Sequence, residues 1–359
     1  MTATAYRYAP ERVRPPGSTL LEVLDERAMT QSDLAIRTGL STKHINQIVK
    51  GTASISPETT ILLERATGVS ASMWTNLESA YQLDRSRTKE AEKLKLELDW
   101  LKTLPLAELV KRKRIQSASY SIDTLREVCN FFGVADKASW EALWERPTAY
   151  RRSKAFSSDP TAVAAWLRIG EIEAMKISCS PFDKAKLLSS LEDLRSLTRL
   201  SDPDEWVPRL KSTCQDIGIA VVFEPEISGA RIVGATRWVQ SDKVLIQLSL
   251  RHRWSDIFWF TFFHEIGHLL LHSKKDIFIN DQGPHSGAES EADAFASQLL
   301  IPRRFEDRLS TLQSDDDVKK FAGELGIGPD IVVGRLQFEK RWPYTRGAAL
   351  KRRFTFSKS

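Results

Sequence analysis

The sequence has 359 residues, of which 28% are charged and 42% hydrophobic, and its formal net charge is +5. This length allows two or three domains with substantial cores, and the composition is that of an ordinary globular protein. The net charge and a pI near 9.0 permit contact with nucleic acid without requiring it. The three cysteines, Cys129, Cys179 and Cys214, are too widely spaced for a paired-cysteine metal knuckle and suggest no disulfide framework.

The N-terminal residues 1–17 contain three prolines and a glycine among Arg and Tyr, without an apolar period. We expect a flexible arm there, which could grip DNA, although a solvated tail is the commoner outcome. No signal peptide is visible, and the most apolar segment of the chain is interrupted by ionisable residues, so it is no membrane span. A cytoplasmic location is the expectation.

Residues 18–83 predict an all-α helix-turn-helix domain. Ser18 or Thr19 can cap a first helix. Thr30 should cap the next one, Gly39 should provide a turn position with positive φ, and Ser41 should cap a third helix. Two more helices are predicted at 57–68 and 73–81. The buried side is expected to contain Leu34, Ala35, Leu40, Ile45, Ile48 and Val49.

The outward face of the third helix carries residue types that read DNA bases. Asn and Gln can bridge adenine, and Lys can meet guanine or phosphate. If this helix enters the major groove, its first residues reach base edges, while Gln31 contacts the backbone. A small bundle that binds only protein is the alternative. Such modules usually bind palindromic operators as dimers, so a homodimer is expected. The predicted DNA contacts are Gln31, Ser41, Thr42, Lys43, His44, Asn46, Gln47 and Lys50.

Residues 84–200 are predicted to be a helical linker or spacer region, which separates two modules or senses a partner. A charged stretch at 84–102 predicts a long polar helix. Trp140, Trp144 and Trp166 are expected to pack a helical core. The basic run 111–114 either touches DNA phosphates or is a solvated helix end. Further helices are predicted at 104–114, 122–132, 140–144, 161–174 and 182–197.

The apolar period changes near Trp206, where three strands are predicted at 217–223, 234–239 and 244–249. A small antiparallel sheet ahead of an apolar helix implies an α+β domain, which we place at 201–310. The strand 244–249 is a candidate exposed edge, to which an extended substrate could pair through backbone groups. An ordinary covered strand is equally compatible with the sequence.

The apolar segment 261–271 contains an HExxH pattern formed by His264, Glu265 and His268. Residues four apart lie nearly above one another on a helix, so both imidazoles can face one metal ion. Glu265 adjoins the first ligand, where a carboxylate can serve as general base for an activated water. Burying these three ionisable residues would be costly without a partner, and a metal ion is such a partner.

A catalytic zinc site needs a third protein ligand. The helical pattern 289–301 offers Glu289, with Asp293 four residues later on the same face. Glu289 suits metal binding, and Asp293 suits a hydrogen bond to the outer nitrogen of a ligand histidine. Glu291 lies about 200° round the helix from Glu289, so the two cannot both face the ion.

Residues 261–271 with 289–302 resemble the ImmA/IrrE family of metallopeptidases, and 30–51 resemble an XRE-type helix-turn-helix, particularly the HigA version. Between the two matches the resemblance is loose. It implies a zincin-like peptidase fold, with His264, His268 and Glu289 as metal ligands and Glu265 as base and proton shuttle. The family acts mostly on repressors, through a limited cut in a protein partner.

The sequence therefore predicts a multidomain, mainly α protein that binds operator DNA and cuts a protein with a bound metal. Zn²⁺ is the default for two His and one carboxylate, with Mn²⁺ or Fe²⁺ not excluded. The alternatives are a non-catalytic HigA-like antitoxin that binds a toxin, and a regulator that only senses metal. His285, in a predicted loop at 280–288, and His272 are candidates for stabilising a transition state. Residues 311–359 should form helices and a solvated basic tail.

Overall fold

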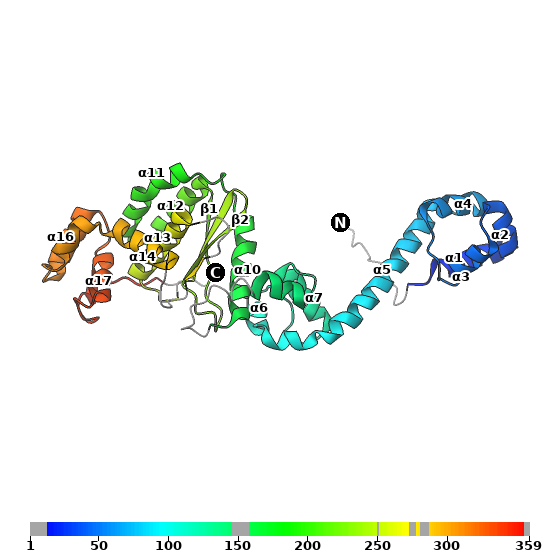
Figure 1. Cartoon of the computed structure of the whole chain (residues 1–359), viewed down its shortest axis with the longest axis horizontal. Coiled ribbons are helices and arrows are strands. Elements are labelled where there is room, and N and C mark those ends of the chain that lie inside the picture. The colour runs from blue at the N-terminus through cyan, green and yellow to red at the C-terminus, as the bar shows by residue number, and fades with distance from the viewer. Residues whose placement is uncertain (1–12, 146–157, 250, 273–277, 281–286, 355–359) are drawn as a thin grey trace, which may run out of the picture. The chain divides into compact units, whose positions relative to one another are not determined.

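The computed structural model describes residues 13–145, 158–249, 251–272, 278–280 and 287–354. It divides into two compact units, Met1–Glu97 and Leu98–Ser359. Figure 1 shows the helical first unit and the second unit, which contains the sheet. The sequence placed the first boundary after Leu83, and the structure corrects this. No Gly or Pro interrupts residues 71–96, so the fifth helix continues through the charged stretch as far as Leu96.

The first unit is a five-helix module whose helix ends follow the predicted local signals. Thr30 and Asp33 form a reciprocal capping box, and Gly39 has a φ of +72°. Ser41 caps the next helix by accepting from the His44 N–H at 3.1 Å. The helices are α1 (Pro16–Glu26), α2 (Gln31–Thr38), α3 (Thr42–Val49), α4 (Pro57–Thr67) and α5 (Ala71–Leu96).

The start of the first helix corrects the prediction of a flexible arm up to residue 17. Residues 1–12 lie outside the described part of the chain, but Pro16 and Gly17 are buried in the first turn of α1. Proline suits this position because its missing N–H has no partner there. A Cβ on Gly17 would lie 2.3 Å from the Ile48 carbonyl oxygen. The absence of a side chain therefore lets α1 pack directly against α3, and neither Ser18 nor Thr19 is the cap.

The core of this unit contains the expected apolar residues and the fully buried Trp74 from α5. Leu34, Ile45 and Ile48 are at most 2% exposed. Leu40 and Val49 are partly buried against them. The predicted buried side is thus confirmed.

The second unit begins with helices that the sequence predicted as a spacer. Trp140 and Trp144 pack against Phe132, and Trp166 is fully buried, as expected. The elements are η1 (Leu98–Thr103), α6 (Leu106–Lys111), α7 (Ile122–Phe132), α8 (Lys137–Trp140), η2 (Glu141–Glu145), α10 (Pro160–Lys176), α11 (Lys184–Ser196), η3 (Leu197–Arg199) and α12 (Pro203–Ile217).

The sheet has the order β1-β3-β2-β4, with β1 (Ile219–Phe223), β2 (Gly234–Gln240), β3 (Lys243–Leu248) and β4 (Phe278–Asn280). It is mixed rather than antiparallel, because β1 runs parallel to β3 while β2 runs antiparallel to both β3 and β4. The prediction of β3 as an exposed edge is wrong. This strand is central, paired on both sides, and all six of its residues are buried. No sequence signal predicted β4.

Helices cover both faces of the sheet, and this explains why all six residues of β3 are buried, including Lys243 and Gln247. α10 packs on one face, where Ala174 lies with Ala220, Val222 and Leu245. α12 and α13 (Ser255–Leu271) pack on the other face against Val221 and Ile246. Figure 1 shows α10 on one side of the strands and α12 and α13 on the other.

The C-terminal elements belong to the same core as the sheet, so residue 310 is not a boundary. Leu325, Val332 and Phe354 join the large apolar cluster that includes α13. The elements are α14 (Ala288–Leu300), η4 (Arg303–Phe305), α15 (Glu306–Leu309), α16 (Asp315–Leu325), α17 (Pro329–Phe338) and η5 (Ala348–Leu350).

Two residues of the basic tail, Lys351 and Arg352, are partly buried and paired, contrary to the prediction of a solvated tail, while Arg353 is exposed. Arg352 donates to the fully buried Asp330 at 2.7 Å and to two backbone carbonyls. Lys351 lies 2.5 Å from Asp256. The tail forms a strap that holds the beginnings of α13 and α17.

Among the described helices, none is long and apolar enough to cross a membrane.

Candidate metal centre and nucleic-acid interface

The HExxH helix α13 and the following helix α14 lie against each other at close range. Gly267, inside the motif, allows this approach, because a Cβ there would lie 3.1 Å from the Ala292 Cα. Phe262, Phe263 and Ile266 anchor α13 in the core. The apolar residues of α13 thereby fix the positions of its polar ones.

Three side chains meet between the two helices: His264 and His268 from α13 and Glu289 from α14. The two histidine Nε2 atoms are 2.9 Å apart. The Glu289 Oε2 lies 3.1 Å from the His264 Nε2 and 3.4 Å from the His268 Nε2. Both histidines are at most 1% exposed. The structure thus brings together the three residues predicted as ligands.

This arrangement fits a divalent metal ion by the chemistry of its donor atoms. Ligand distances of about 2.0–2.2 Å in a tetrahedral site place donor atoms about 3.3–3.6 Å apart, and the separations here, 2.9, 3.1 and 3.4 Å, are within this range or slightly shorter. The outer ring nitrogen of each histidine is already engaged. The His264 Nδ1 lies 2.9 Å from Asp293, and the His268 Nδ1 lies 3.2 Å from the His272 Nδ1. Both Nε2 atoms therefore face the position of an ion.

The pKa shifts of the cluster favour a positive charge among its carboxylates. Burial opposes charge on His264, but hydrogen bonds with Asp293 and Glu289 outweigh it and raise the pKa to about 10. Burial favours the neutral form of Glu289, but hydrogen bonds with the two histidines lower its pKa to about 2. Burial lowers the pKa of His268. Without an ion, a proton on His264 balances the carboxylates, and a metal cation can replace it.

Glu265 points from the same helix toward β2. Its Oε2 accepts from the Thr236 hydroxyl at 2.7 Å. Its Oε1 is buried and has no hydrogen-bond partner among the described residues. Gly234 makes room for that oxygen, since a Cβ there would lie 2.5 Å from it. Burial raises the pKa of Glu265 to about 7, although the His264 charge and the Thr236 hydroxyl act in the opposite direction.

The proposed base-reading face of α3 is solvent-accessible. Thr42, Lys43 and Gln47 are exposed, as are Ser41 and Lys50. His44 and Asn46 are half-buried, and the Asn46 amide donates to the half-buried Gln31 at 3.4 Å. The structure thus gathers the predicted DNA contacts on the N-terminal part of α2 and along α3, and their contacts with DNA stay a prediction.

Comparisons with known protein families match both of these regions. Residues 20–74 match the helix-turn-helix family, and residues 214–337 match the IrrE N-terminal-like domain of peptidase family M78. The chain joins a helix-turn-helix domain to an IrrE-like peptidase domain. The IrrE-like domain extends beyond residue 310, in agreement with the shared core. No curated protein matches the chain.

Solved structures are similar to a short part of the chain. A HigA-family addiction module antidote protein from Coxiella burnetii is 28% identical, over 24% of this chain and 95% of that one, with a TM-score of 0.22. Antitoxin HigA from Pseudomonas aeruginosa, solved with the higBA promoter, is 31% identical, over 24% and 95%, with a TM-score of 0.23. At such TM-scores we draw no conclusion from these similarities.

The structure places two further residues that the sequence analysis named in the IrrE-like domain, Glu291 and His272. Glu291 faces away from the ligand cluster, as the helical geometry required, and lies 3.0 Å from the His272 Nε2. His272 ends α13 and contacts His268, so its two ring nitrogens lie against protein groups. His285 and most of the predicted loop 280–288 lie outside the described residues.

Sequence reasoning missed several residues that shape this site. Thr236 and Gly234, which position Glu265, come from a strand 29 or more positions earlier, and no local pattern predicts that contact. Gly267 was visible inside the motif, and its lack of a side chain could have indicated a close helix partner. The contact between His272 and Glu291 was also missed.

Proposed function

We propose that this protein is a DNA-binding transcription regulator whose IrrE-like domain is a metal-dependent endopeptidase that makes limited cuts in a protein partner. The observation that carries the proposal is the convergence of His264, His268 and Glu289 beside the buried Glu265. A purely structural helix pair would gain nothing from three fully buried ionisable groups beside a fourth, Glu289, that is 26% exposed, because burying each costs desolvation energy.

The three proposed ligands indicate that the cofactor is a divalent metal ion. His264, His268 and Glu289 would hold the ion, with Zn²⁺ the first choice for two imidazoles and one carboxylate and Mn²⁺ or Fe²⁺ compatible. When bound, such an ion supplies a Lewis acid that polarises a peptide carbonyl and acidifies water. Asp293 keeps the proton of His264 on Nδ1, which directs the Nε2 lone pair toward the ion.

Glu265 is suited to take a proton from water and pass it to the leaving amine. Thr236 donates to its Oε2 and fixes the carboxylate, while the Oε1 has no partner among the described residues. A pKa of about 7 allows the group to accept a proton from water and return it to a leaving amine near neutral pH. Glu265 thus acts as general base and then as general acid.

The helix-turn-helix domain directs the protein to DNA. Lys43 and Gln47 are exposed on α3, and their side chains match phosphate, guanine and adenine edges. We infer an operator read by α3, bound by a homodimer as is usual for this module. The protein that is cut would be a repressor or a component of a toxin–antitoxin pair encoded near that operator.

The first experiment measures metal content and cleavage. Purified wild type, His264→Ala and Glu265→Gln are analysed for bound metal and then incubated with proteins encoded near the operator. We expect one metal in wild type, none in His264→Ala, and one metal without cleavage in Glu265→Gln. A specific cut by Glu265→Gln at the wild-type rate would contradict the role of this carboxylate.

The same experiment separates the alternatives. If wild type binds no stoichiometric metal, the peptidase proposal fails, and a HigA-like antitoxin that uses this fold as a binding surface takes its place. If metal changes the DNA affinity and no protein is cut, the protein is a metal-sensing regulator. DNA binding has its own test, in which Gln47→Ala should weaken operator binding by about 1–3 kcal/mol and relax sequence preference.

A further inference from the structure

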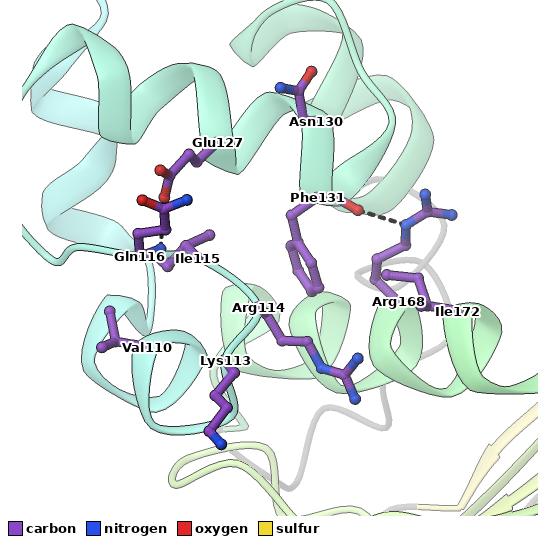
Figure 2. A pocket seen from close by; sticks show the side chains of 10 residues that line it. All are labelled: Val110, Lys113, Arg114, Ile115, Gln116, Glu127, Asn130, Phe131, Arg168 and Ile172. Carbon is purple, nitrogen blue, oxygen red and sulfur yellow. Dashed lines mark hydrogen bonds between the residues drawn. The ribbon is translucent and has the colours of Figure 1, made fainter. Parts of the chain in front are cut away.

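A pocket of about 790 Å³ lies in the second unit, among α6, α7, α10 and the loop 112–121. This volume falls in the range of small-molecule sites, roughly 300–1,000 Å³. Figure 2 shows the side chains that line it. They are Val110, Lys113, Arg114, Ile115, Gln116, Glu127, Asn130, Phe131, Arg168 and Ile172. None of these residues belongs to the metal centre or to the DNA-reading face.

The lining combines positive charge with an apolar wall. Lys113, Arg114 and Arg168 are cationic, and Glu127 is the one acidic residue among the ten. In the view of Figure 2 the ring of Phe131 lies between the Arg114 and Arg168 side chains. Val110, Ile115 and Ile172 add aliphatic surface. A ligand with an anionic group and an apolar or aromatic body would match this lining.

The two arginines are fixed in position before any ligand arrives. Arg114 lies 2.7 Å from Glu173, and Arg168 lies 3.1 Å from Glu171. The Arg168 Nε also donates to the Phe131 carbonyl at 2.6 Å. A guanidinium held this way can present its other N–H groups to a carboxylate or phosphate at a low entropic cost.

The carboxylates that hold the arginines do not cancel the positive charge. Glu173 also accepts from Lys176 at 2.9 Å. Glu171 also lies 3.4 Å from Arg237. Each carboxylate is therefore shared between two cations. The charge that remains around the pocket favours an anion.

Lys113 occupies a backbone position that favours glycine. Its φ is +56°. Its N–H donates to the Val110 carbonyl, and the Arg114 N–H donates to the Leu109 carbonyl, which is the Schellman pattern at the end of α6. A lysine here carries backbone strain that a glycine would avoid. The Lys113 side chain lines the pocket.

We propose that this pocket binds a small organic anion, whose carboxylate or phosphate is held by Lys113, Arg114 and Arg168 while its apolar body lies against Phe131 and Ile172. Ion pairs connect this site to the sheet. Arg168 and Arg237 share Glu171, and Arg237 lies on β2. An anion at Arg168 competes with Glu171 and so disturbs a contact that reaches the strand of Thr236.

The test is direct binding to the full chain, measured by ligand-observed NMR and calorimetry with three probes. Benzoate and phenyl phosphate carry the two anionic groups on one aromatic ring, and benzamide is the neutral counterpart. We expect at least one anion to bind at least tenfold more tightly than benzamide. The comparison between the two anions identifies the preferred group.

Two variants and a matched control assign the binding to the pocket. Arg168→Gln and Lys113→Gly should each weaken anion binding at least tenfold. Lys113→Gly relieves strain and should keep the wild-type unfolding temperature. Lys340→Gly is the control, because Lys340 has the same φ of +56° in the same pattern at the end of α17, outside the pocket. It should bind the anion as wild type does.

Three results would overturn the proposal. The first is equal binding of benzamide and the anions. The second is an equal loss of anion binding in Lys340→Gly and Lys113→Gly. The third is weaker binding of duplex DNA in Lys113→Gly with no binding of either small anion, which would make the basic loop a contact for the DNA backbone. Because binding is measured without metal or cleavage, failure of the peptidase proposal leaves this test intact.

Discussion

The two units keep their functional residues in opposite environments. In the helix-turn-helix domain, Lys43 and Gln47 are exposed above a core to which they contribute nothing. In the IrrE-like domain, His264 and Glu265 are fully buried on the helix that also supplies much of the apolar core. We therefore expect a substitution on the proposed DNA-reading face to alter function alone. A substitution near the proposed metal centre should alter function and stability together.

The largest expected effect is on the strap that closes the second unit. Asp330→Ala removes the carboxylate that pairs with Arg352 at 2.7 Å and leaves the guanidinium without its charge partner. We expect a loss of about 3–5 kcal/mol in the free energy of unfolding of this unit. Hydrogen exchange followed by mass spectrometry should show faster opening of α13 and unchanged exchange in α2 and α3.

The control is Glu324→Ala, which breaks the exposed pair with Arg308. Both partners of that pair are about half exposed and screened by water, so the loss should be much smaller than in Asp330→Ala. Equal losses in Asp330→Ala and Glu324→Ala would show that burial of the strap contributes no special stability.

Removal of the metal should lower the stability of one unit and leave the stability of the other unchanged. A chelator should lower the stability of the IrrE-like domain by about 3 kcal/mol, if the ion is present at about 100 times its dissociation constant. The helix-turn-helix domain should unfold at the same temperature with and without chelator. Calorimetry on the full chain measures both transitions, and a shift of the helix-turn-helix transition would contradict the independence of the units.

Gly234→Ala tests whether packing places the Glu265 carboxylate, the proposed general base. The new Cβ would overlap with the Glu265 Oε1 at 2.5 Å and with Thr261 at 2.8 Å. We expect a loss of about 1–3 kcal/mol in stability, at least a tenfold loss of cleavage, and unchanged metal content. Gly323→Ala in α16, with nothing within 4 Å, should gain up to about 1 kcal/mol. Wild-type cleavage by Gly234→Ala would exclude this positioning role.

The smallest effect is expected in the first unit. Thr30→Ala removes the capping box with Asp33 and should destabilise the helix-turn-helix domain by about 1 kcal/mol. Metal content and cleavage should not change, and operator affinity at low temperature should stay within a factor of two or so of wild type. A change in cleavage would show that the two units are energetically coupled.

Local signals made much of the molecule predictable from sequence. Thr30, Gly39 and Ser41 act on backbone groups within four residues, so the ends of α2 and α3 follow from the sequence directly. The HExxH spacing is likewise local to one helix. The choice of Glu289 over Glu291 needed only helical periodicity, and the structure places both side chains accordingly.

Long-range contacts were not predictable in this way. The central place of β3 depends on parallel pairing with β1 and antiparallel pairing with β2, and an apolar strand alone does not reveal its neighbours. In the sequence Arg352 resembles a solvated tail residue. Only the structure shows that it pairs with the buried Asp330. The Thr236–Glu265 hydrogen bond joins a strand to a helix whose relative placement the sequence does not encode locally.

The strap also affects how the protein is made. Residues 351–354 complete the second unit, with Phe354 in its core and Arg353 bridged to Trp254. Phe354 is synthesised 257 residues after Glu97, where the first unit ends. At roughly 5–20 residues per second this is a delay of about 13–50 seconds. The domain that would find an operator is therefore folded on the nascent chain well before the domain that would cut a protein.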